Sequence, residues 1–387
     1  PKVALLLDEL HQWRGTETHL FRLLQQLDRD AMEPVVMVLG RDGLASAFSG
    51  LGVTFHSLGI SKVLAPTGPL GLKKLIATLR GEDARLLVAY HTAADMLAPL
   101  AGTSLGIPVL SCRRDMGFTK KPMHVKIQRR LNMLLQGMIS VSHAVAREVE
   151  RTEGFPLGLN RVIWNGEDLD RFSPGLSPMR RDLGLGPEQL ILTCVGGLSE
   201  VKDHQSMLAA FQRVVGQYPE ARLVLAGDGP RRAVLEQQAR AMPGKVHFLG
   251  QRSDIPELLR GSDIYIQTSR SEGFSNSILQ AMATALPVVA TRAGGNLEMV
   301  TSQSGVLTEV GDVQAMARGM ERLLSSAQLR QDMGWAGRAW AEANGSLEAM
   351  TSAYENTFTR AMDGRIPGEG TIESPPLAVD KKRLMVG

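Results

Sequence analysis

Short apolar runs alternate along this chain with stretches in which apolar residues recur every three or four positions. In the first half the runs are Val3–Leu7, Val35–Leu39, Leu86–Ala89 and Val109–Cys112. Short continuous apolar runs are typical of strands that are buried on both faces, and the stretches between them, such as 20–27, have the period of an amphipathic helix. The alternation predicts an α/β fold with a parallel sheet that is covered by helices.

The second half repeats the same alternation. Its apolar runs are Ile191–Val195, Leu223–Ala226, Val246–Leu249, Ile264–Gln267 and Val288–Thr291. A segment rich in Pro, Gly and Ser, Phe172–Pro178, separates the two sets and predicts a linker over 171–186. We therefore expect two Rossmann-like domains, residues 1–170 and 171–346. Because doubly wound sheets bind ligands at the carboxyl ends of their strands, we expect the ligand in a cleft between the domains.

The end of the chain differs from the rest. A helix is predicted over 347–362. From residue 364 to 387, Pro, Gly and charged residues dominate. Such a composition buries too little apolar surface to order itself, so we expect a flexible tail there.

The segment Ser271–Gly295 carries the densest signal and reads SEGFSNSILQAMATALPVVATRAGG. Glu272 stands on a Gly-Phe turn, small polar residues follow, and a helix is predicted over 278–286 until Pro287 ends it. Exposed N–H groups at a helix N-terminus favour an anion, whereas Glu272 would repel a phosphate alone. The combination fits a ligand with a phosphate end and a hydroxyl-rich end, as in a nucleotide-sugar.

This phrase resembles the signature of the retaining glycosyltransferases of family 4, which have the GT-B fold. The matching stretches are Glu272 to Phe274, Gln280 to Ala283 and Leu286 to Thr291. The resemblance implies two Rossmann-like domains that face across a cleft, and a C-terminal helix that crosses back to the N-terminal domain. It also implies a nucleotide-diphosphate sugar donor, with UDP favoured, and no metal or other cofactor.

Breaking a sugar–phosphate bond leaves negative charge on the departing diphosphate, which the site has to stabilise. By the resemblance, Lys202 does this and Glu272 meets hydroxyls of the donor sugar, so these two are the expected catalytic residues. The donor-binding positions implied by the resemblance are Gly15, Gly197, Lys202, Gln251, Arg252, Glu272, Gly273, Phe274, Ser275, Asn276, Ser277, Ile278 and Gln280.

Two positions depart from the family pattern. Gly197 stands where the family has Arg, and Gln280 stands where it has a second Glu. A charge-assisted contact is worth about 1.5–3 kcal/mol, so the loss of one slows transfer by about 10- to 150-fold unless another group replaces it. Possible replacements are Arg292, Arg252, Arg113 and Arg114, among which we favour Arg113 or Arg114. Gln280 still has hydrogen-bonding capacity for a ribose diol.

The N-terminal half offers weaker candidates for an acceptor or a phosphate. Gly15 and Thr16 open the first predicted helix, where a phosphate or an ordinary helix cap would fit. His91 follows a strand and is either functional or structural. Arg113 and Arg114 form bidentate forks that suit phosphate or carboxylate.

A basic amphipathic patch follows these residues. Lys120, Lys121, Lys126, Arg129 and Arg130 have no acidic residue between them, and apolar residues are interleaved. The pattern suits an anionic membrane surface, and a solvated helix face is the alternative. If the patch binds lipid, we expect a lipid-linked acceptor.

Composition narrows the class of protein further. The chain has 387 residues and a net charge of +3, so no overall nucleic-acid signature is present. Two isolated cysteines, Cys112 and Cys194, favour a reducing compartment over a disulfide framework. No spacing indicates a metal site. We expect a cytoplasmic protein, with peripheral contact at the inner face of the cell membrane if the basic patch binds lipid.

The sequence therefore favours a retaining hexosyl- or N-acetylhexosaminyl-transferase of polysaccharide biosynthesis with a glycan or lipid-linked acceptor. The two departures keep a second hypothesis open, a catalytically silent GT-B protein that binds sugar-nucleotide or scaffolds a partner. A sugar-nucleotide epimerase would need a cluster of acid/base groups that we do not find. A glycosidase would need a close carboxylate pair, which Gln280 disrupts.

Overall fold

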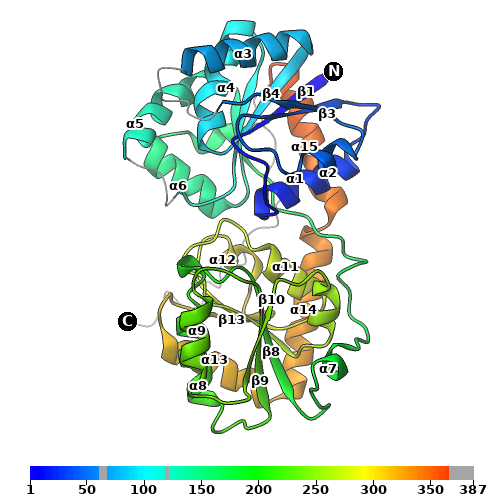
Figure 1. Cartoon of the computed structure of the whole chain (residues 1–387), viewed down its shortest axis with the longest axis vertical. Coiled ribbons are helices and arrows are strands. Elements are labelled where there is room, and N and C mark those ends of the chain that lie inside the picture. Colours follow the sequence, from blue (N-terminus) through cyan, green and yellow to red (C-terminus); the bar gives the residue numbers. More distant parts are fainter. Residues whose placement is uncertain (61–67, 118–121, 366–387) are drawn as a thin grey trace.

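The computed structural model describes residues 1–60, 68–117 and 122–365. The chain forms two α/β domains, one above the other in Figure 1, each built on a single parallel sheet. The predicted fold class, two Rossmann-like domains with a C-terminal helix that returns to the first, is confirmed.

The N-terminal domain is built on a seven-stranded sheet with the order β3-β2-β1-β4-β5-β6-β7. Its strands are β1 (Lys2–Leu7), β2 (Glu33–Val38), β3 (Thr54–Ser57), β4 (Ala84–Tyr90), β5 (Val109–Arg113), β6 (Gly137–Ser140) and β7 (Asn160–Val162). Its helices are α1 (Gly15–Gln26), α2 (Ala45–Ser49), α3 (Gly68–Gly81), α4 (Thr92–Leu105), α5 (Pro122–Leu131) and α6 (His143–Glu153), with short 3₁₀ turns η1 (Asn132–Leu134) and η2 (Leu157–Leu159).

The C-terminal domain is built on a six-stranded sheet with the order β10-β9-β8-β11-β12-β13. Its strands are β8 (Leu190–Val195), β9 (Ala221–Ala226), β10 (Val246–Gly250), β11 (Ile264–Gln267), β12 (Val288–Thr291) and β13 (Gly305–Thr308). The helices of this half are α7 (Met179–Asp182), α8 (His204–Val214), α9 (Arg232–Ala239), α10 (Ile255–Arg260), α11 (Asn276–Ala283), α12 (Asn296–Met299), α13 (Val313–Leu324) and α14 (Ala327–Asn344), with the 3₁₀ turn η3 (Glu200–Lys202).

Both sheets reverse their strand order at one place. The reversal lies between β1 and β4 in the first sheet and between β8 and β11 in the second. Loops that leave neighbouring strands on either side of such a switch point diverge to opposite faces and open a crevice. The segments after these four strands, which begin at Asp8, His91, Gly196 and Thr268, are therefore where a ligand is expected.

Helix α15 (Leu347–Met362) joins the end of the chain to its beginning. In Figure 1 it runs up from the lower domain and lies beside α1 in the upper one. Its apolar face, with Tyr354 and Phe358 fully buried, packs into the same core cluster as Leu20 and Leu23 of α1. The helix predicted over 347–362 is thus confirmed, and the N-terminal core contains residues from both ends of the described chain.

The predicted helix over 278–286 is shorter in the structure. Helix α11 ends at Ala283, and Ala285 has a left-handed φ of 59°. The N–H of Leu286 donates to the carbonyl of Ala281 at 2.9 Å, and the N–H of Ala285 donates to that of Met282 at 2.9 Å. This is a Schellman turn, which ends the helix before Pro287 does.

The predicted linker and tail are placed only in part. The segment 171–186 connects β7 to β8 and contains the single-turn helix α7. The domain limits at 170/171 and 346/347 stay predictions. Of the tail predicted over 364–387, all but its first two residues lies outside the described residues.

Candidate functional site

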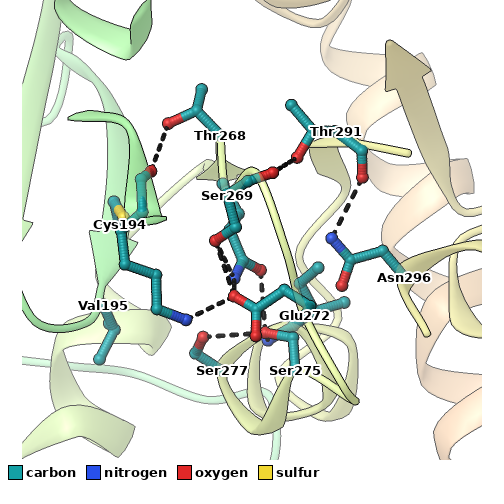
Figure 2. A network of polar contacts seen from close by, with 12 residues as sticks. Cys194, Val195, Thr268, Ser269, Glu272, Ser275, Ser277, Thr291 and Asn296 are labelled. Atoms are coloured by element: carbon teal, nitrogen blue, oxygen red, sulfur yellow. Dashed lines mark hydrogen bonds and ion pairs between the residues drawn. The ribbon is translucent and has the colours of Figure 1, made fainter. Parts of the chain in front are cut away.

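The loop after β11 holds Glu272 in a dense polar network (Figure 2). Its carboxylate oxygen Oε1 accepts hydrogen bonds from Gln267 Nε2 at 2.6 Å and from Ser269 Oγ at 2.7 Å. The loop is in turn fixed to β12, because Thr291 Oγ1 donates to the carbonyl of Ser269 at 2.5 Å. The side chain of Glu272 is only 10% exposed, so its orientation is set by the protein before any ligand binds.

Lys202 reaches the same carboxylate from the loop after β8. Its ammonium donates to Glu272 Oε1 and forms an ion pair with it. The Thr268 hydroxyl ties this loop to the end of β11, because it lies 3.0 Å from the Lys202 carbonyl oxygen and 2.9 Å from that of Asp203. The two residues that the sequence singles out as catalytic are therefore in direct contact across the switch point of the second sheet.

The donors around Glu272 are distributed unevenly. Lys202, Gln267 and Ser269 all donate to Oε1. Within the described part of the chain, no hydrogen-bond donor reaches Oε2. A carboxylate oxygen has two lone-pair directions, so Oε2 is the atom that can accept a ligand hydroxyl while Oε1 keeps the side chain in place.

The Glu272 loop packs tightly against the N-terminal domain. A Cβ at Gly273 would lie 2.2 Å from the carbonyl oxygen of Arg114, so only glycine fits there. A Cβ at Gly294 would lie 1.7 Å from the carbonyl oxygen of Glu272, and Gly294 has a φ of 49°. Gly273 thus brings the Glu272 loop against the loop after β5, and Gly294 brings the loop after β12 against the backbone of Glu272.

A cavity of about 870 Å³ lies where the two domains meet. Its N-terminal wall comes from the loops after β1, β2, β4 and β5, and Phe274 and Asn276 contribute from the C-terminal domain. Among the described residues that line it, Glu272 and Lys202 are absent. The cavity therefore adjoins the Glu272 network through Phe274 and lies mainly on the N-terminal side.

Asp8 and His91 end β1 and β4, at the switch point of the first sheet, and both line this cavity. The carboxylate of Asp8 accepts backbone hydrogen bonds from Ala93 at 2.9 Å and Ala94 at 2.7 Å, in the first turn of α4. Burial raises the pKa of Asp8 to about 6, against the lowering effect of these two amides. Sequence reasoning missed Asp8, although its position directly after the first strand was a usable signal.

His91 is held in an unusual backbone conformation, with a φ of 75°. Such a conformation is costly for a residue other than glycine and is found most often at functional positions. Burial lowers the pKa of His91 to about 4, so its imidazole is neutral near pH 7. The predicted acceptor or phosphate role of His91 is thus compatible with hydrogen bonding but not with a positive charge.

Gly15 and Thr16 also line the cavity, at the start of α1. The N-cap residue, Arg14, makes no side-chain capping hydrogen bond. The first backbone N–H groups of a helix lack partners within the helix, and Gly15, Thr16 and Glu17, which carry them here, line the cavity. This placement agrees with the predicted phosphate position at Gly15, which stays a prediction.

Arg113 is engaged inside the N-terminal domain, and its predicted role as a phosphate contact stays a prediction. Its guanidinium is buried and paired with Asp95 and, at 2.8 Å, with Glu153. Both partners belong to helices of the N-terminal domain, so Arg113 stabilises that domain internally. Arg114, by contrast, lines the interdomain cavity and donates to Asn165 Oδ1 at 2.5 Å. Arg113 lines only a smaller cavity of about 180 Å³ on the N-terminal side, together with His91 and Arg114. Of the two candidates, Arg114 is therefore the one on the wall of the interdomain cavity.

The two departures from the family pattern have different surroundings. Gly197 is exposed, and a Cβ built on it meets only the carbonyl oxygen of Asp228, at 3.7 Å. Gln280 is half-buried and donates through Nε2 to Glu167 Oε2 at 2.7 Å. Glu167 is buried and also pairs with Arg22 at 2.7 Å, so Gln280 is part of a contact between the two domains.

Three further predicted donor positions, Ser275, Ser277 and Ile278, lie at the start of α11. Ser275 is buried, caps α11 by accepting from the Ile278 N–H, and donates to Gln267 Oε1 at 2.8 Å. Ser277 lies beside it, with the two hydroxyl oxygens 3.2 Å apart (Figure 2). The side chain of Ile278 is fully buried in the core. These three shape the loop, and a ligand could reach Ile278 only through its backbone.

Gln251 and Arg252 follow β10 near the outer edge of the second sheet. Gln251 is exposed, and Arg252 donates to Asp254 Oδ1 at 2.7 Å as part of an ion pair. Neither side chain contacts the Glu272 network in the described structure. Their predicted role in holding the nucleotide base stays a prediction.

Sequence reasoning also missed Glu298, which joins the two domains. Glu298 of α12 is 6% exposed and accepts from the backbone N–H groups of His143 at 3.0 Å and Ala144 at 2.8 Å. It also accepts from the Trp164 indole at 2.8 Å. A carboxylate from one domain thereby caps helix α6 of the other. No local pattern could reveal this contact, because its partners are more than 130 positions away.

The predicted basic patch is described in part. Lys126, Arg129 and Arg130 are exposed on α5, whereas Lys120 and Lys121 lie outside the described residues. Met123 and Met133, 63% and 84% exposed, stand on the same segment. Through the described chain, no helix combines the length and apolar character needed to cross a bilayer. The same residues contain no cluster of three or more potential metal ligands.

Comparison with known proteins identifies the class. The family model described as Glycosyltransferase Family 4 matches residues 13–171, and the model described as Glycosyl transferases group 1 matches residues 177–340. A putative glycosyltransferase, EpsD of Bacillus subtilis, is 30% identical over 308 residues, which cover 73% of this chain and 78% of that protein. The chain therefore belongs to glycosyltransferase family 4.

Other relatives match less of their length. N-acetyl-alpha-D-glucosaminyl L-malate synthase of Bacillus anthracis is 30% identical over 222 residues, which cover 57% of this chain and 58% of that enzyme. The chain thus spans little more than half of this relative. The crystal structure of Anabaena Alr3699/HepE in complex with UDP superposes with a TM-score of 0.83 over 92% of this chain and 99% of that chain. At 22% identity it shows the shared fold.

Proposed function

We propose that the protein is a retaining glycosyltransferase that moves a hexosyl or N-acetylhexosaminyl group from a nucleotide-diphosphate sugar to a glycan or lipid-linked acceptor. The observation that carries the proposal is the contact between Lys202 and Glu272 at the switch point of the second sheet. Lys202 offers a cation for the diphosphate, and Glu272 beside it offers a carboxylate for the sugar hydroxyls. UDP is the favoured nucleotide, because a protein with the same fold was solved with UDP.

The reaction that suits these groups occurs on one face of the sugar. The bond between the anomeric carbon and the diphosphate breaks, the acceptor oxygen bonds to that carbon from the same side, and its proton passes to the departing phosphate oxygen. Lys202 stabilises the charge on the diphosphate. Glu272 positions the sugar through Oε2 and stabilises positive charge that develops on the ring. Such a scheme uses no metal, so we expect EDTA to leave the rate unchanged.

The test compares binding and turnover across a panel of UDP- and GDP-sugars. We expect Glu272→Ala and Glu272→Gln to lower kcat/KM by at least about 100-fold, or about 2.7 kcal/mol, because the sugar loses its charged partner. Glu309→Gln is the matched control, because Glu309 is 76% exposed and pairs with Arg292 on the surface. A product with inverted anomeric configuration would refute front-face transfer.

A silent, nucleotide-binding protein is the second candidate. It is favoured by Gly197, which removes a cation from the phosphate side, and by Gln280, whose amide already binds Glu167. The same panel separates the two candidates. If UDP-sugars bind by calorimetry but no turnover occurs with any acceptor, including water, the protein is catalytically silent. Turnover that disappears in Glu272→Ala would exclude it.

The exposed face of α5 supports a second part of the proposal, contact with an anionic membrane. Lys126, Arg129 and Arg130 are exposed, although Arg129 also donates to the Thr152 carbonyl at 2.8 Å, and the exposed Met123 and Met133 stand on the same segment. Exposed basic and apolar residues together suit an acidic lipid surface. We expect the protein to float with vesicles that contain phosphatidylglycerol and not with neutral vesicles. Each basic residue near the surface contributes about 1 kcal/mol, so replacing all three by Ser should abolish flotation.

The control for the membrane experiment keeps the change in net charge the same. Arg213, Arg318 and Arg322 are exposed on helices α8 and α13 of the other domain. Their replacement by Ser should leave flotation intact. Equal flotation with neutral and anionic vesicles, or equal loss in both triple variants, would remove the membrane proposal.

A further inference from the structure

The wall of the interdomain cavity carries a charge pattern that bears on the acceptor. Among the described lining residues, four carry carboxylates and three carry guanidinium groups. The carboxylates are those of Asp8, Glu9, Glu17 and Asp115, and the guanidinium groups are those of Arg14, Arg41 and Arg114. The wall is therefore formally negative by one charge, although the protein as a whole carries +3.

The arginines of this wall are already engaged. Arg41 forms a fork with Glu9, with contacts of 3.2 and 2.8 Å. Arg14 donates to Gln12 at 3.0 Å, and Arg114 donates to Asn165 at 2.5 Å. Only Arg41 is paired with a carboxylate, because Gln12 and Asn165 are neutral. The charges of Arg14 and Arg114 therefore face the three remaining carboxylates of the wall, and an anionic group that entered the cavity would meet a net negative charge.

Asp8 is the best-fixed of these carboxylates. Each of its oxygens accepts one backbone N–H from the start of α4, so the side chain cannot turn away from the cavity. A carboxylate oxygen has a second lone pair, which suits a hydroxyl donor. His91 stands beside it on the same wall, and its neutral ring both donates and accepts hydrogen bonds.

We propose that the cavity takes an uncharged, polyhydroxylated acceptor ring, whose hydroxyls donate to Asp8, and that it rejects a ring bearing a phosphate or carboxylate. Asp8 is thus a specificity-determining residue on the acceptor side. This inference rests on the proposed function, because the cavity is an acceptor site only if a donor binds on the other side. The diphosphate of such a donor adds a further reason to exclude a second anion.

The experiment measures sugar binding to the full chain saturated with UDP. The probes are methyl α-D-glucopyranoside, methyl α-D-mannopyranoside and their 6-phosphates. Their binding is measured by calorimetry or by saturation-transfer NMR. We expect the neutral glycosides to bind and the 6-phosphates to bind more weakly. In Asp8→Asn we expect affinity for the neutral glycosides to fall by about tenfold or more, as for the loss of a hydrogen bond to a charged group.

Asp8→Asn keeps one acceptor oxygen for the first turn of α4 and loses the second backbone bond, so UDP must bind to the variant as it binds to the native protein before a loss of sugar affinity is assigned to the sugar contact. Asp312→Asn is the matched control: Asp312 caps α13 by accepting from Ala315 N at 2.8 Å, in the other domain. The inference is overturned if the 6-phosphates bind as well as the neutral sugars, if Asp8→Asn behaves like Asp312→Asn, or if neither sugar class binds while UDP does. Failure of UDP itself to bind would instead sink the proposed function.

Discussion

At the scale of single residues, the donor side depends on how one carboxylate is held. Oε1 of Glu272 is fixed by three donors, one of them charged, and Oε2 is left for the ligand. A side chain with this arrangement loses little entropy when a sugar binds, because its rotamer is already set. In the proposed scheme, Lys202 is the cation for the donor diphosphate, and Gly197 stands where the family pattern has an arginine.

Gly197→Arg should therefore improve the enzyme. The position is exposed, and a Cβ there makes only an ordinary contact of 3.7 Å, so a side chain fits. A restored charge-assisted contact is worth about 1.5–3 kcal/mol, which predicts a rise in kcat/KM of about 10- to 150-fold in steady-state assays.

Gly216→Arg is the control for this gain. Gly216 is also exposed, nothing lies within 4 Å of a Cβ built there, and it belongs to the turn after α8. It should leave kcat/KM unchanged. A Gly197→Arg enzyme that is stable but no faster would mean that another group, such as Arg114, already supplies the missing charge.

Residue types could be predicted from the sequence, but side-chain directions could not. Successive residues of a strand point to opposite faces, and Arg113 is the last residue of β5. Its side chain turns inward to Asp95 and Glu153, whereas Arg114 turns to the cleft. The pair looked equivalent in the sequence because nothing local shows which of two neighbours meets buried carboxylates from distant helices.

At the scale of elements, the domains are held together by helix ends. The carboxylate of Glu298 on α12 caps α6 of the other domain and also holds the Trp164 indole, with contacts of 2.8–3.0 Å. These are charge-assisted bonds in a nearly buried position, where they are stronger than surface ion pairs. Together with the contact of Gly273 with the Arg114 backbone, these bonds hold the two domains against each other.

Glu298→Gln should weaken this arrangement. The amide presents an NH₂ group to N–H donors, so at least one charge-assisted bond is lost, worth about 1.5–3 kcal/mol. We expect a larger radius of gyration by small-angle X-ray scattering and a KM for the donor that rises about tenfold or more. Glu309→Gln again serves as control. An unchanged scattering curve and unchanged KM would show that Glu298 does not hold the domains closed.

Element prediction succeeded where apolar runs were long enough. The strand over Val288–Thr291 has the predicted limits. The strands β3, β6, β7 and β13 were missed because glycine or polar residues interrupt their apolar runs, which read TFHS, GMIS, NRV and GVLT. Their pairing to longer neighbours, and not their own apolar content, makes them strands.

At the scale of the whole molecule, the chain closes on itself. Helix α15 is the last described helix, yet its buried residues belong to the core that forms around β1 and α1. The N-terminal domain is therefore completed only by a segment that follows the C-terminal domain in sequence. The resemblance to the family predicted that this helix packs on the N-terminal domain. Hydrophobic periodicity alone predicted the helix but not the domain that it contacts.

This closure predicts that a core mutation near the end of the chain destabilises the beginning. Phe358 of α15 is fully buried, and so is Phe211 of α8 in the core of the other domain. Each change to Ala removes a buried aromatic ring and should cost about 3–5 kcal/mol. By hydrogen exchange, Phe358→Ala should speed exchange in β1, β4 and α1 and leave β8 and β9 protected, whereas Phe211→Ala should do the reverse. If Phe358→Ala loosened both sheets equally, the two domains would unfold as one cooperative unit, and the contacts of Glu298 and Glu167 would have to be strong enough to couple them.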